Sequence, residues 1–229
     1  VVSVSSFLGF PVKILTALVS GSPIARMISD DLSRRHIDVE AKYIEQGGPW
    51  GHRHQFNIAD AGFGGRAPRV HNDRAGEAGR TMAPGDFDLD RIFSTEGVQI
   101  VHISGLVAAL SPSTGELCLE VARKAKQAGS LVSFDLNYRA SFWKEEPDRL
   151  RRVFHEIATN SHILIGNEED FQLALGLEGP EAGGKDLAAK IDGFKGMIEE
   201  AEQEKAQAAL LEMKQTREAR KAEELAAEE

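Results

Sequence analysis

The sequence predicts an α/β fold with a parallel sheet, because short apolar strands alternate regularly with helical stretches. The expected strands span residues 98–104, 131–137 and 163–166, and a stretch with helical spacing of apolar residues follows each one. Alternation of this kind requires right-handed crossover connections. We therefore expect parallel strands that helices cover on both faces.

The helices expected after these strands span residues 112–128, 147–158 and 168–175. In the first of them Leu117, Val121 and Ala125 recur at helical spacing, which places them on one core-facing side. Cys118 lies beside them and is expected in the core. Because it is the one cysteine of the chain, it excludes an intramolecular disulfide and a cysteine-based zinc site.

The first third of the chain predicts a strand at 12–19, a helix at 23–35 and a strand at 39–45. In the helix Ile24, Met27, Ile28 and Leu32 have core-facing spacing. Residues 52–59 alternate as an exposed or half-buried strand, and residues 60–85 read as extended segments and loops. Residues 198–229 contain no Gly or Pro, so we expect a charged, solvated C-terminal helix there.

Composition limits the function classes open to this chain. Of its 229 residues 41% are hydrophobic, enough for a core, and the net charge of −9 argues against general affinity for nucleic acid or an anionic membrane. No apolar run has transmembrane length, and the first residues lack a basic signal-peptide region. We therefore expect a soluble, cytoplasmic protein.

One polar cluster ends the expected strand 131–137, where Asp135, Asn137 and Arg139 alternate. Along an extended chain such positions point to the same side, so a carboxylate, an amide and a guanidinium would converge. Ligands of open α/β sheets bind beyond the carboxyl ends of strands. The alternative, at about even odds, is that Asp135 pairs with Arg139 while Asn137 caps the next element.

A second cluster, Gly166 to Asp170, joins the strand 163–166 to the next helix. Its carboxylates could hold Mg²⁺ through water beside the phosphates of a nucleotide. The alternative is purely structural, since Asn is a good N-cap and the helix dipole favours acids in the first turn. Two such clusters at adjacent strand ends favour the functional interpretation.

His52 and His54 lie two residues apart and could chelate a metal. No third ligand is evident nearby. An exposed strand with aromatic neighbours is therefore the better interpretation of this pair.

Seven stretches of the chain, taken in order, carry a resemblance to a known family: FPVKILTALVSGSPIARMISDDL, GHRHQFNIADAGFG, PRVHNDRAGEAGRTMAPGDFDLDRIF, VQIVHISGLVAALSP, SFDLNYRASFWK, ILIGNEEDFQLALG and EGPEAGGKDLAAKIDGFKGMI. Together they resemble the ribokinase-like (PfkB) carbohydrate kinases, and among these the 2-keto-3-deoxygluconate kinase branch. The resemblance covers residues from roughly 8 to 198.

The resemblance implies an ATP-dependent, Mg²⁺-requiring kinase of an acid sugar. It implies an incomplete ribokinase-like α/β core with a partial doubly wound parallel sheet (1–38 and 86–198) and a small β-sheet lid (39–85). Residues 199–229, beyond the resemblance, are expected to form a helical, Ala/Glu-rich tail. The resemblance assigns substrate binding to Arg74, Asp135, Asn137 and Arg139. It assigns nucleotide binding to Asn167 and Asp170, the latter a shortened acid at its position, and metal binding to Glu169 and Asp170.

The chain also departs from the family pattern, which implies a catalytically incomplete protein. It begins after the family's first strand and its Gly-Gly helix start, and it contains no Gly-Ala-Gly-Asp turn. That turn supplies the anion hole and the catalytic Asp, so we expect no catalytic residue here. The alternatives are a non-catalytic sugar-binding fragment, a homodimer formed through the lid, or, against the ordered motifs, another nucleotide-binding α/β enzyme.

Overall fold

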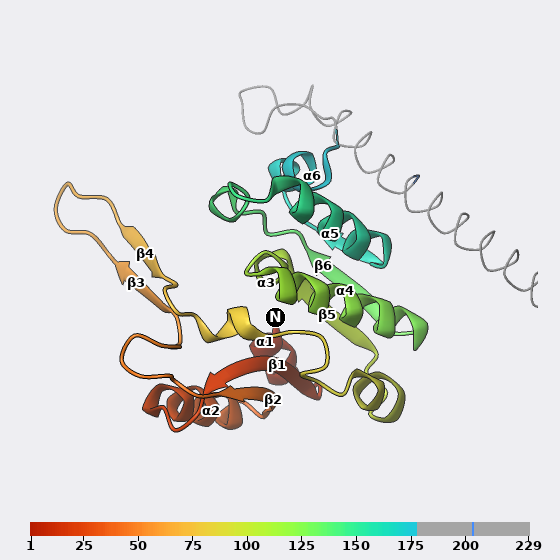
Figure 1. Ribbon diagram of the computed structural model, residues 1–229, viewed down its shortest axis with the longest axis horizontal. Coiled ribbons are helices and arrows are strands. Elements are labelled where there is room, and N and C mark those ends of the chain that lie inside the picture. Colours follow the sequence, from red (N-terminus) through yellow and green to blue (C-terminus); the bar gives the residue numbers. More distant parts are fainter. Residues whose placement is uncertain (178–202, 204–229) are drawn as a thin grey trace, which may run out of the picture. The chain divides into compact units, whose positions relative to one another are not determined.

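The computed structural model describes residues 1–177 and Gln203, and these residues belong to two compact units. The first unit contains residues 1–89 and 110–117, and the second contains residues 90–109 and those from 118 onward. The helix expected at 198–229 lies outside the described residues except for Gln203. Figure 1 draws the described elements in colour.

The first unit is built on a βαβ motif. Strand β1 (Val12–Val19) pairs in parallel with β2 (Ile37–Ile44) along eight residue pairs, and helix α2 (Pro23–Arg34) connects them. The helix begins after Ser22, whose hydroxyl accepts hydrogen bonds from the backbone N–H groups of Ile24 and Ala25. All three expected elements are therefore confirmed, and β2 starts two residues earlier than expected. The expected core position Met27 is wrong, because its side chain is 63% exposed.

Residues 39–85, the expected lid, include a two-stranded hairpin. Strand β3 (Phe56–Asp60) runs antiparallel to β4 (Arg69–Asp73), and the hairpin extends away from β1 and β2 (Figure 1). The expected strand at 52–59 is correct only from Phe56 onward. Its first half forms no strand: Arg53 makes an isolated parallel bridge with Glu77, and the side chain of His54 is buried.

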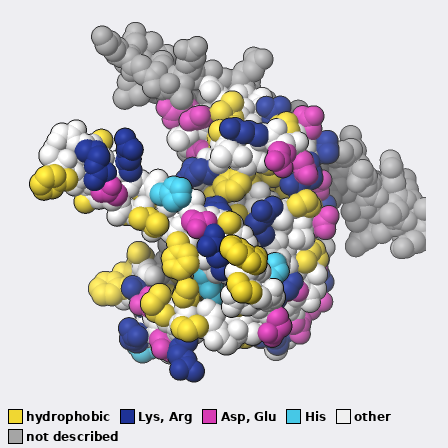
Figure 2. All heavy atoms as spheres, turned by 60° about the vertical axis from the view of Figure 1, so that its left-hand side comes forward, with side chains coloured by type: hydrophobic (Ala, Val, Ile, Leu, Met, Phe, Trp, Pro, Cys, Tyr) yellow, Lys and Arg dark blue, Asp and Glu magenta, His cyan; other side chains and the backbone are white. Residues whose placement is uncertain are grey.

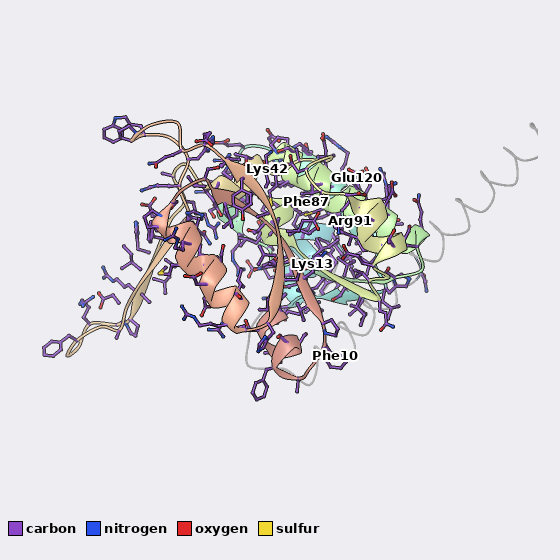
Figure 3. The ribbon with its side chains drawn as sticks, turned by 90° about the horizontal axis from the view of Figure 1, so that it is seen from below. Phe10, Lys13, Lys42, Phe87, Arg91 and Glu120 are labelled. Atoms are coloured by element: carbon purple, nitrogen blue, oxygen red, sulfur yellow. The ribbon has the colours of Figure 1, made fainter. Side chains whose placement is uncertain are left out.

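Part of the expected lid shares a sheet with the expected core. Strand β2 pairs along its whole length with β1, so its residues 39–44 belong to the same sheet as 12–19. The Lys42 side chain on β2 donates to the Thr81 carbonyl oxygen at 2.5 Å and to Asp86 Oδ2 at 2.9 Å. Figure 3 labels Lys42 on β2 and Lys13 on β1. The remaining helical elements of this unit are α1 (Val2–Phe7) and the 3₁₀ turn η1 (Ala78–Thr81).

The second unit contains a parallel three-stranded sheet in the order β5-β6-β7. Its strands are β5 (Ile100–Ser104), β6 (Leu131–Asp135) and β7 (Ile163–Ile165). The predicted parallel α/β architecture is thereby confirmed. The strands are shorter than expected, and β6 in particular ends two residues early.

Helices alternate with these strands, as predicted. They are the π-helical turn η2 (Arg91–Thr95), α3 (Gly105–Ala108), α4 (Pro112–Gln127), the 3₁₀ turn η3 (Ala140–Phe142), α5 (Pro147–Thr159) and α6 (Glu168–Leu175). Helix α4 begins in the first unit and ends in the second. Its predicted core residues Leu117, Val121 and Ala125 are all buried, as is Cys118.

Aromatic packing anchors α5 to the sheet. The ring of Phe154 on α5 meets Phe134 on β6 edge-on with centroids 5.3 Å apart, and both side chains are fully buried. Trp143 packs against the same Phe154 ring at 5.0 Å and against Tyr138 at 5.2 Å. This row of rings connects the core to the segment that follows β6. No helix within residues 1–177 is long and apolar enough to cross a membrane.

Candidate functional site

Polar side chains gather at the carboxyl ends of the three strands in the second unit. The sheet register pairs Ser104, the last residue of β5, with Asp135, the last residue of β6, and pairs Asp135 with Ile165 at the end of β7. Asn167 follows two residues after β7. The edge where α/β proteins bind ligands is therefore lined by hydroxyl, carboxylate and amide groups.

The segment after β6 does not continue as an extended strand. Leu136 still donates its backbone N–H to the Ile165 carbonyl oxygen at 2.8 Å, but Asn137 has a positive φ of 40°. The exposed Arg139 side chain donates to the Tyr138 carbonyl oxygen at 2.8 Å. The expectation that Asp135, Asn137 and Arg139 point to one side of an extended chain is therefore wrong, because the left-handed turn at Asn137 interrupts the alternation.

The structural alternative for this cluster is not observed either. Within residues 1–177 the Asp135 carboxylate makes no hydrogen bond and no ion pair, so it does not pair with Arg139. Asn137 instead donates through Nδ2 to the Ser104 hydroxyl at 3.1 Å. A half-buried carboxylate without a protein partner is a group ready to accept hydrogen bonds from a bound hydroxyl.

Two glycines allow close packing around Leu136. A Cβ on Gly105, at the start of α3, would lie 1.9 Å from the Leu136 carbonyl oxygen and 2.7 Å from the Phe154 ring. A Cβ on Gly166 would lie 3.1 Å from Leu136 Cδ1. Leu136 is itself fully buried. The Leu136 carbonyl is thus packed against Gly105 more closely than any residue with a Cβ would allow, and the Leu136 side chain is packed tightly against Gly166.

The second cluster forms a capping box at the start of α6. The Asn167 side-chain oxygen accepts from the Asp170 N–H at 2.8 Å, and Asp170 Oδ2 accepts from the Asn167 N–H at 2.9 Å. Asp170 Oδ1 accepts a third hydrogen bond, from the Tyr138 N–H at 2.8 Å. The sequence-based alternative, that Asn167 is an N-cap, is therefore confirmed.

Glu169 differs from Asp170 in being exposed. Its carboxylate makes no hydrogen bond or ion pair among residues 1–177, whereas both oxygens of Asp170 accept backbone N–H groups. In the same part of the chain no group of three His, Cys, Asp or Glu side chains could hold a metal ion. Mg²⁺ keeps several waters and needs only one or two carboxylates beside a substrate phosphate. These donors fit such a water-rich site and do not fit a complete protein cage.

His102 is a polar residue of this edge that the sequence reasoning missed. Its Nδ1 lies 3.1 Å from the hydroxyl oxygen of Ser133, its register partner on β6. Burial lowers the pKa of His102, and the nearby Asp135 carboxylate opposes that shift. The signal was present in the strand itself, since His102 and Ser104 stand two residues apart and so share one face.

In the first unit Arg74 is paired with an acid. Its Nη1 donates to both carboxylate oxygens of the buried Glu77, at 2.9 and 2.8 Å. Glu77 thereby holds the guanidinium that the family motif assigns to the acid sugar.

The histidine pair of this unit does not form a metal site. His52 is exposed, whereas His54 is buried and its Nε2 accepts from the Val19 N–H at 3.4 Å. The interpretation of both residues as members of an exposed strand is also wrong, because His54 is buried and neither residue belongs to a strand. Burial raises the pKa of Cys118 to about 12, which agrees with its expected place in the core.

Comparison with known proteins supplies the family. The model of the pfkB family carbohydrate kinases matches residues 88–219, more than half of the chain. This chain belongs to the pfkB carbohydrate kinase family. The match covers the three-stranded sheet and both polar clusters, and it confirms the resemblance found in the sequence.

The matched relatives carry the names of several sugar kinases, among them 5-dehydro-2-deoxygluconokinases as well as the two described next. The chain is 33% identical over 118 residues to a 2-dehydro-3-deoxygalactonokinase from Haloferax volcanii, covering 50% of this chain and 36% of the relative. It is 28% identical over 171 residues to a 2-dehydro-3-deoxygluconokinase from Thermoproteus tenax, covering 73% and 48%. It thus spans about half or less of the length of these relatives.

The solved structure of a 2-dehydro-3-deoxygluconokinase from Thermotoga maritima has the same fold. It superposes with a TM-score of 0.71 at 23% sequence identity, covering 90% of this chain and 58% of that one. The ribokinase-like fold predicted from the sequence is therefore confirmed.

Proposed function

We propose that this chain is the sugar-binding part of an ATP-dependent kinase that phosphorylates 2-keto-3-deoxygluconate or a related acid sugar. Membership of the pfkB family and the names of the relatives support the reaction class. The observation that carries the proposal is the Asp135 carboxylate, which makes no hydrogen bond or ion pair with residues 1–177 and ends its strand beside Ser104, the acceptor of the Asn137 amide.

In this proposal Asp135 and Asn137 bind sugar hydroxyl groups. A carboxylate accepts hydrogen bonds from two or more hydroxyls, and a side-chain amide both donates and accepts. Arg139 is exposed and forms no ion pair among residues 1–177, so the N–H donors that do not bind the Tyr138 carbonyl oxygen can bind an anion. We assign Arg139 and Arg74 to the carboxylate or phosphate of the substrate, because a guanidinium binds either in bidentate fashion.

We propose that Mg²⁺ and the ATP phosphates bind near the start of α6. Asn167 and Asp170 organise this helix start, and Glu169 offers the carboxylate whose oxygens have no partner among residues 1–177. Glu169 is therefore the better candidate to hold a metal-bound water, and Asp170 contributes through the backbone it orders. When bound, Mg²⁺ would neutralise charge on the transferring phosphoryl group.

The experiment separates binding from turnover. No Gly-Ala-Gly-Asp sequence occurs within the 229 residues, so we expect this polypeptide, assayed by itself, to bind the acid sugar without measurable turnover. Calorimetry with 2-keto-3-deoxygluconate, with glucose as the neutral control, measures binding, and a coupled ATP-consumption assay measures turnover. Turnover of about one per second would contradict the expectation that this polypeptide is catalytically incomplete, since kinases typically reach that range. Equal affinity for glucose would contradict the acid-sugar assignment.

A second proposal, dimerisation through the hairpin, follows from its surface. Every residue of β3 is exposed, and its apolar side chains and those of β4 and the turn include Phe56, Ile58, Phe63 and Val70. Figure 2 shows hydrophobic and cationic side chains together on this hairpin. A two-stranded ribbon is only marginally stable without a covering surface. A second copy of the hairpin provides one, through the apolar side chains that each copy exposes.

Analytical ultracentrifugation tests this second proposal. Ile58→Lys and Val70→Lys change one apolar position on each face of the hairpin, because their register partners are His71 and Ala59. Loss of a dimer in either variant supports the proposal. A parent chain that sediments as a monomer at high micromolar concentration contradicts it.

A further inference from the structure

The Asp170 carboxylate connects two segments that the family motifs treat separately. Oδ2 accepts from the N–H of Asn167, in the phosphate and metal motif, at 2.9 Å. Oδ1 accepts from the N–H of Tyr138, in the middle of the segment that holds Asn137 and Arg139, at 2.8 Å. One side chain thus joins the start of α6 to the turn that follows β6.

Asp170 is buried, and the space around it accommodates a side chain that contacts both segments. The residue is 8% exposed, and Gly166 leaves the space that it occupies. A Cβ on Gly166 would lie 3.0 Å from Asp170 Cβ and 3.3 Å from Asp170 Oδ2. Its φ is not in the left-handed region, so an added methyl group would meet a tight contact with Asp170 without straining the backbone.

The turn that Asp170 holds is restrained before and after Tyr138 by different contacts. Before the turn, Leu136 is fixed by the Ile165 carbonyl and by close packing against Gly105. After it, Tyr138 is bound by Asp170 and packs on Trp143, and then Arg139 is exposed. The bond from the Tyr138 N–H to Asp170 therefore restrains the turn between Asn137 and Arg139, together with the Asn137–Ser104 bond and the bond from the Phe142 N–H to the Arg139 carbonyl oxygen.

We propose that Asp170 is a positioning residue for the sugar: it fixes segment 136–139 so that Asn137 and Arg139 are presented to the substrate. This inference rests on the proposed function, which places the sugar at these two residues. It gives Asp170 a role in sugar affinity that differs from binding the metal.

The test compares Asp170→Asn with Asp148→Asn as a matched control. Asp148 is likewise an acid in the first turn of a helix, α5, but it is exposed and makes no hydrogen bond within the described chain. The asparagine at 170 keeps the shape of the side chain, but only one of its two terminal atoms accepts a hydrogen bond. Both variants are made in a Trp50→Phe background, where Trp143 is the remaining tryptophan of the chain and Trp50 is 98% exposed.

Two readouts are expected to change together in Asp170→Asn. Hydrogen exchange of the Tyr138 amide should accelerate roughly tenfold or more, since a charge-assisted bond is lost. Affinity for 2-keto-3-deoxygluconate is followed by Trp143 fluorescence and by calorimetry. It should fall by about the same factor, because part of the binding free energy is then used to order segment 136–139. Asp148→Asn should match the Trp50→Phe parent in both.

Gly166→Ala is the second variant, in case Asp170→Asn does not fold. The added methyl group presses on Asp170 and Leu136 without removing a charge. It should accelerate Tyr138 exchange and weaken sugar binding in the same direction, by a smaller factor.

Three outcomes decide the inference. Faster Tyr138 exchange together with weaker sugar binding supports it. Unchanged Tyr138 exchange and sugar affinity in Asp170→Asn, with loss of MgATP binding alone, overturns it in favour of a direct metal ligand. A parent chain that binds no acid sugar overturns the proposed function, and with it the link from Asp170 to the sugar, while the exchange data still show whether the bridge forms.

Discussion

Asn137 donates a hydrogen bond from Nδ2 to the Ser104 hydroxyl at 3.1 Å while its backbone holds a φ of +40°. The bond joins the segment after β6 to the end of the neighbouring strand β5. Asn tolerates the left-handed region better than most residues, so its identity suits both the turn and the bond. Because the chain turns here and does not continue as a strand, the turn determines which groups lie at the edge of the sheet.

Asn137 therefore has a backbone role and a side-chain role, and two substitutions separate them. Asn137→Gly keeps the left-handed turn and removes the amide, whereas Asn137→Ala removes the amide and strains the turn. If the amide contacts the sugar, both variants should lose about tenfold in affinity for 2-keto-3-deoxygluconate by calorimetry, the value of one polar contact. Affinity retained in Asn137→Gly and lost in Asn137→Ala would show that only the backbone matters.

The regular part of the fold was predictable because periodicity reports burial directly. The strand–helix alternation after residue 98 gave parallel β5, β6 and β7, and the spacing of Leu117, Val121 and Ala125 gave the buried face of α4. Met27 has the same helical spacing and is nevertheless exposed. Spacing identifies one face of a helix, but packing against the rest of the unit determines how much of that face is buried.

The places of the candidate residues at the strand ends were predictable, whereas the geometry of the candidate site was not. Asp135 and Asn167 stand at adjacent strand ends, as expected from their places in the sequence. The left-handed turn at Asn137 and the bond from Tyr138 to Asp170 depend on contacts between segments about thirty residues apart. No local pattern specifies such contacts, which is why the assumed same-side alternation failed.

A partly buried ion pair in the first unit should matter more than an exposed one. Lys42 and Asp86 have side chains that are 26% and 20% exposed, and Lys42 also binds the Thr81 carbonyl. Lys42→Met leaves Asp86 without its cation and should lower the free energy of unfolding by about 1–3 kcal/mol. Arg35→Met removes the pair with Asp31, whose side chains are 52% and 51% exposed, and should change it by about 0.5 kcal/mol or less. Equal effects in urea denaturation would contradict this ranking.

Acidification should destabilise the chain through two histidines. Burial lowers the pKa of His54 and His102 below the ordinary value of 6.5. Between the folded and unfolded pKa values the unfolded chain binds more protons, so stability is complete above 6.5 and is lost as the pH falls through the folded pKa. Protonation of His54 would also remove the acceptor of the Val19 N–H.

Urea denaturation at several values between about pH 5 and 8 measures this dependence. His54→Gln retains a side chain that can accept the Val19 N–H and removes the titration, so its stability should fall less on acidification than that of the parent. His52→Gln, two residues away and exposed, is the matched control. A parent and a His54→Gln variant with the same pH dependence would exclude His54 as a contributor.

His36 and Gly129 each follow a helix, and adding a glycine at the first and removing the glycine at the second should change the free energy of unfolding in opposite directions. His36 follows α2 with a φ of +54°, a left-handed conformation that costs a residue with a Cβ about 1 kcal/mol. Gly129 follows α4 with a φ of +80°, and a Cβ there would meet no atom within 4 Å. His36→Gly should therefore raise the free energy of unfolding by up to about 1 kcal/mol, and Gly129→Ala should lower it by about the same amount. Because Gly129→Ala adds no clash, its effect on the free energy of unfolding reports the left-handed backbone alone. Loss of stability in both variants would contradict the prediction, since it would show that the His36 side chain stabilises the fold by more than its left-handed backbone destabilises it.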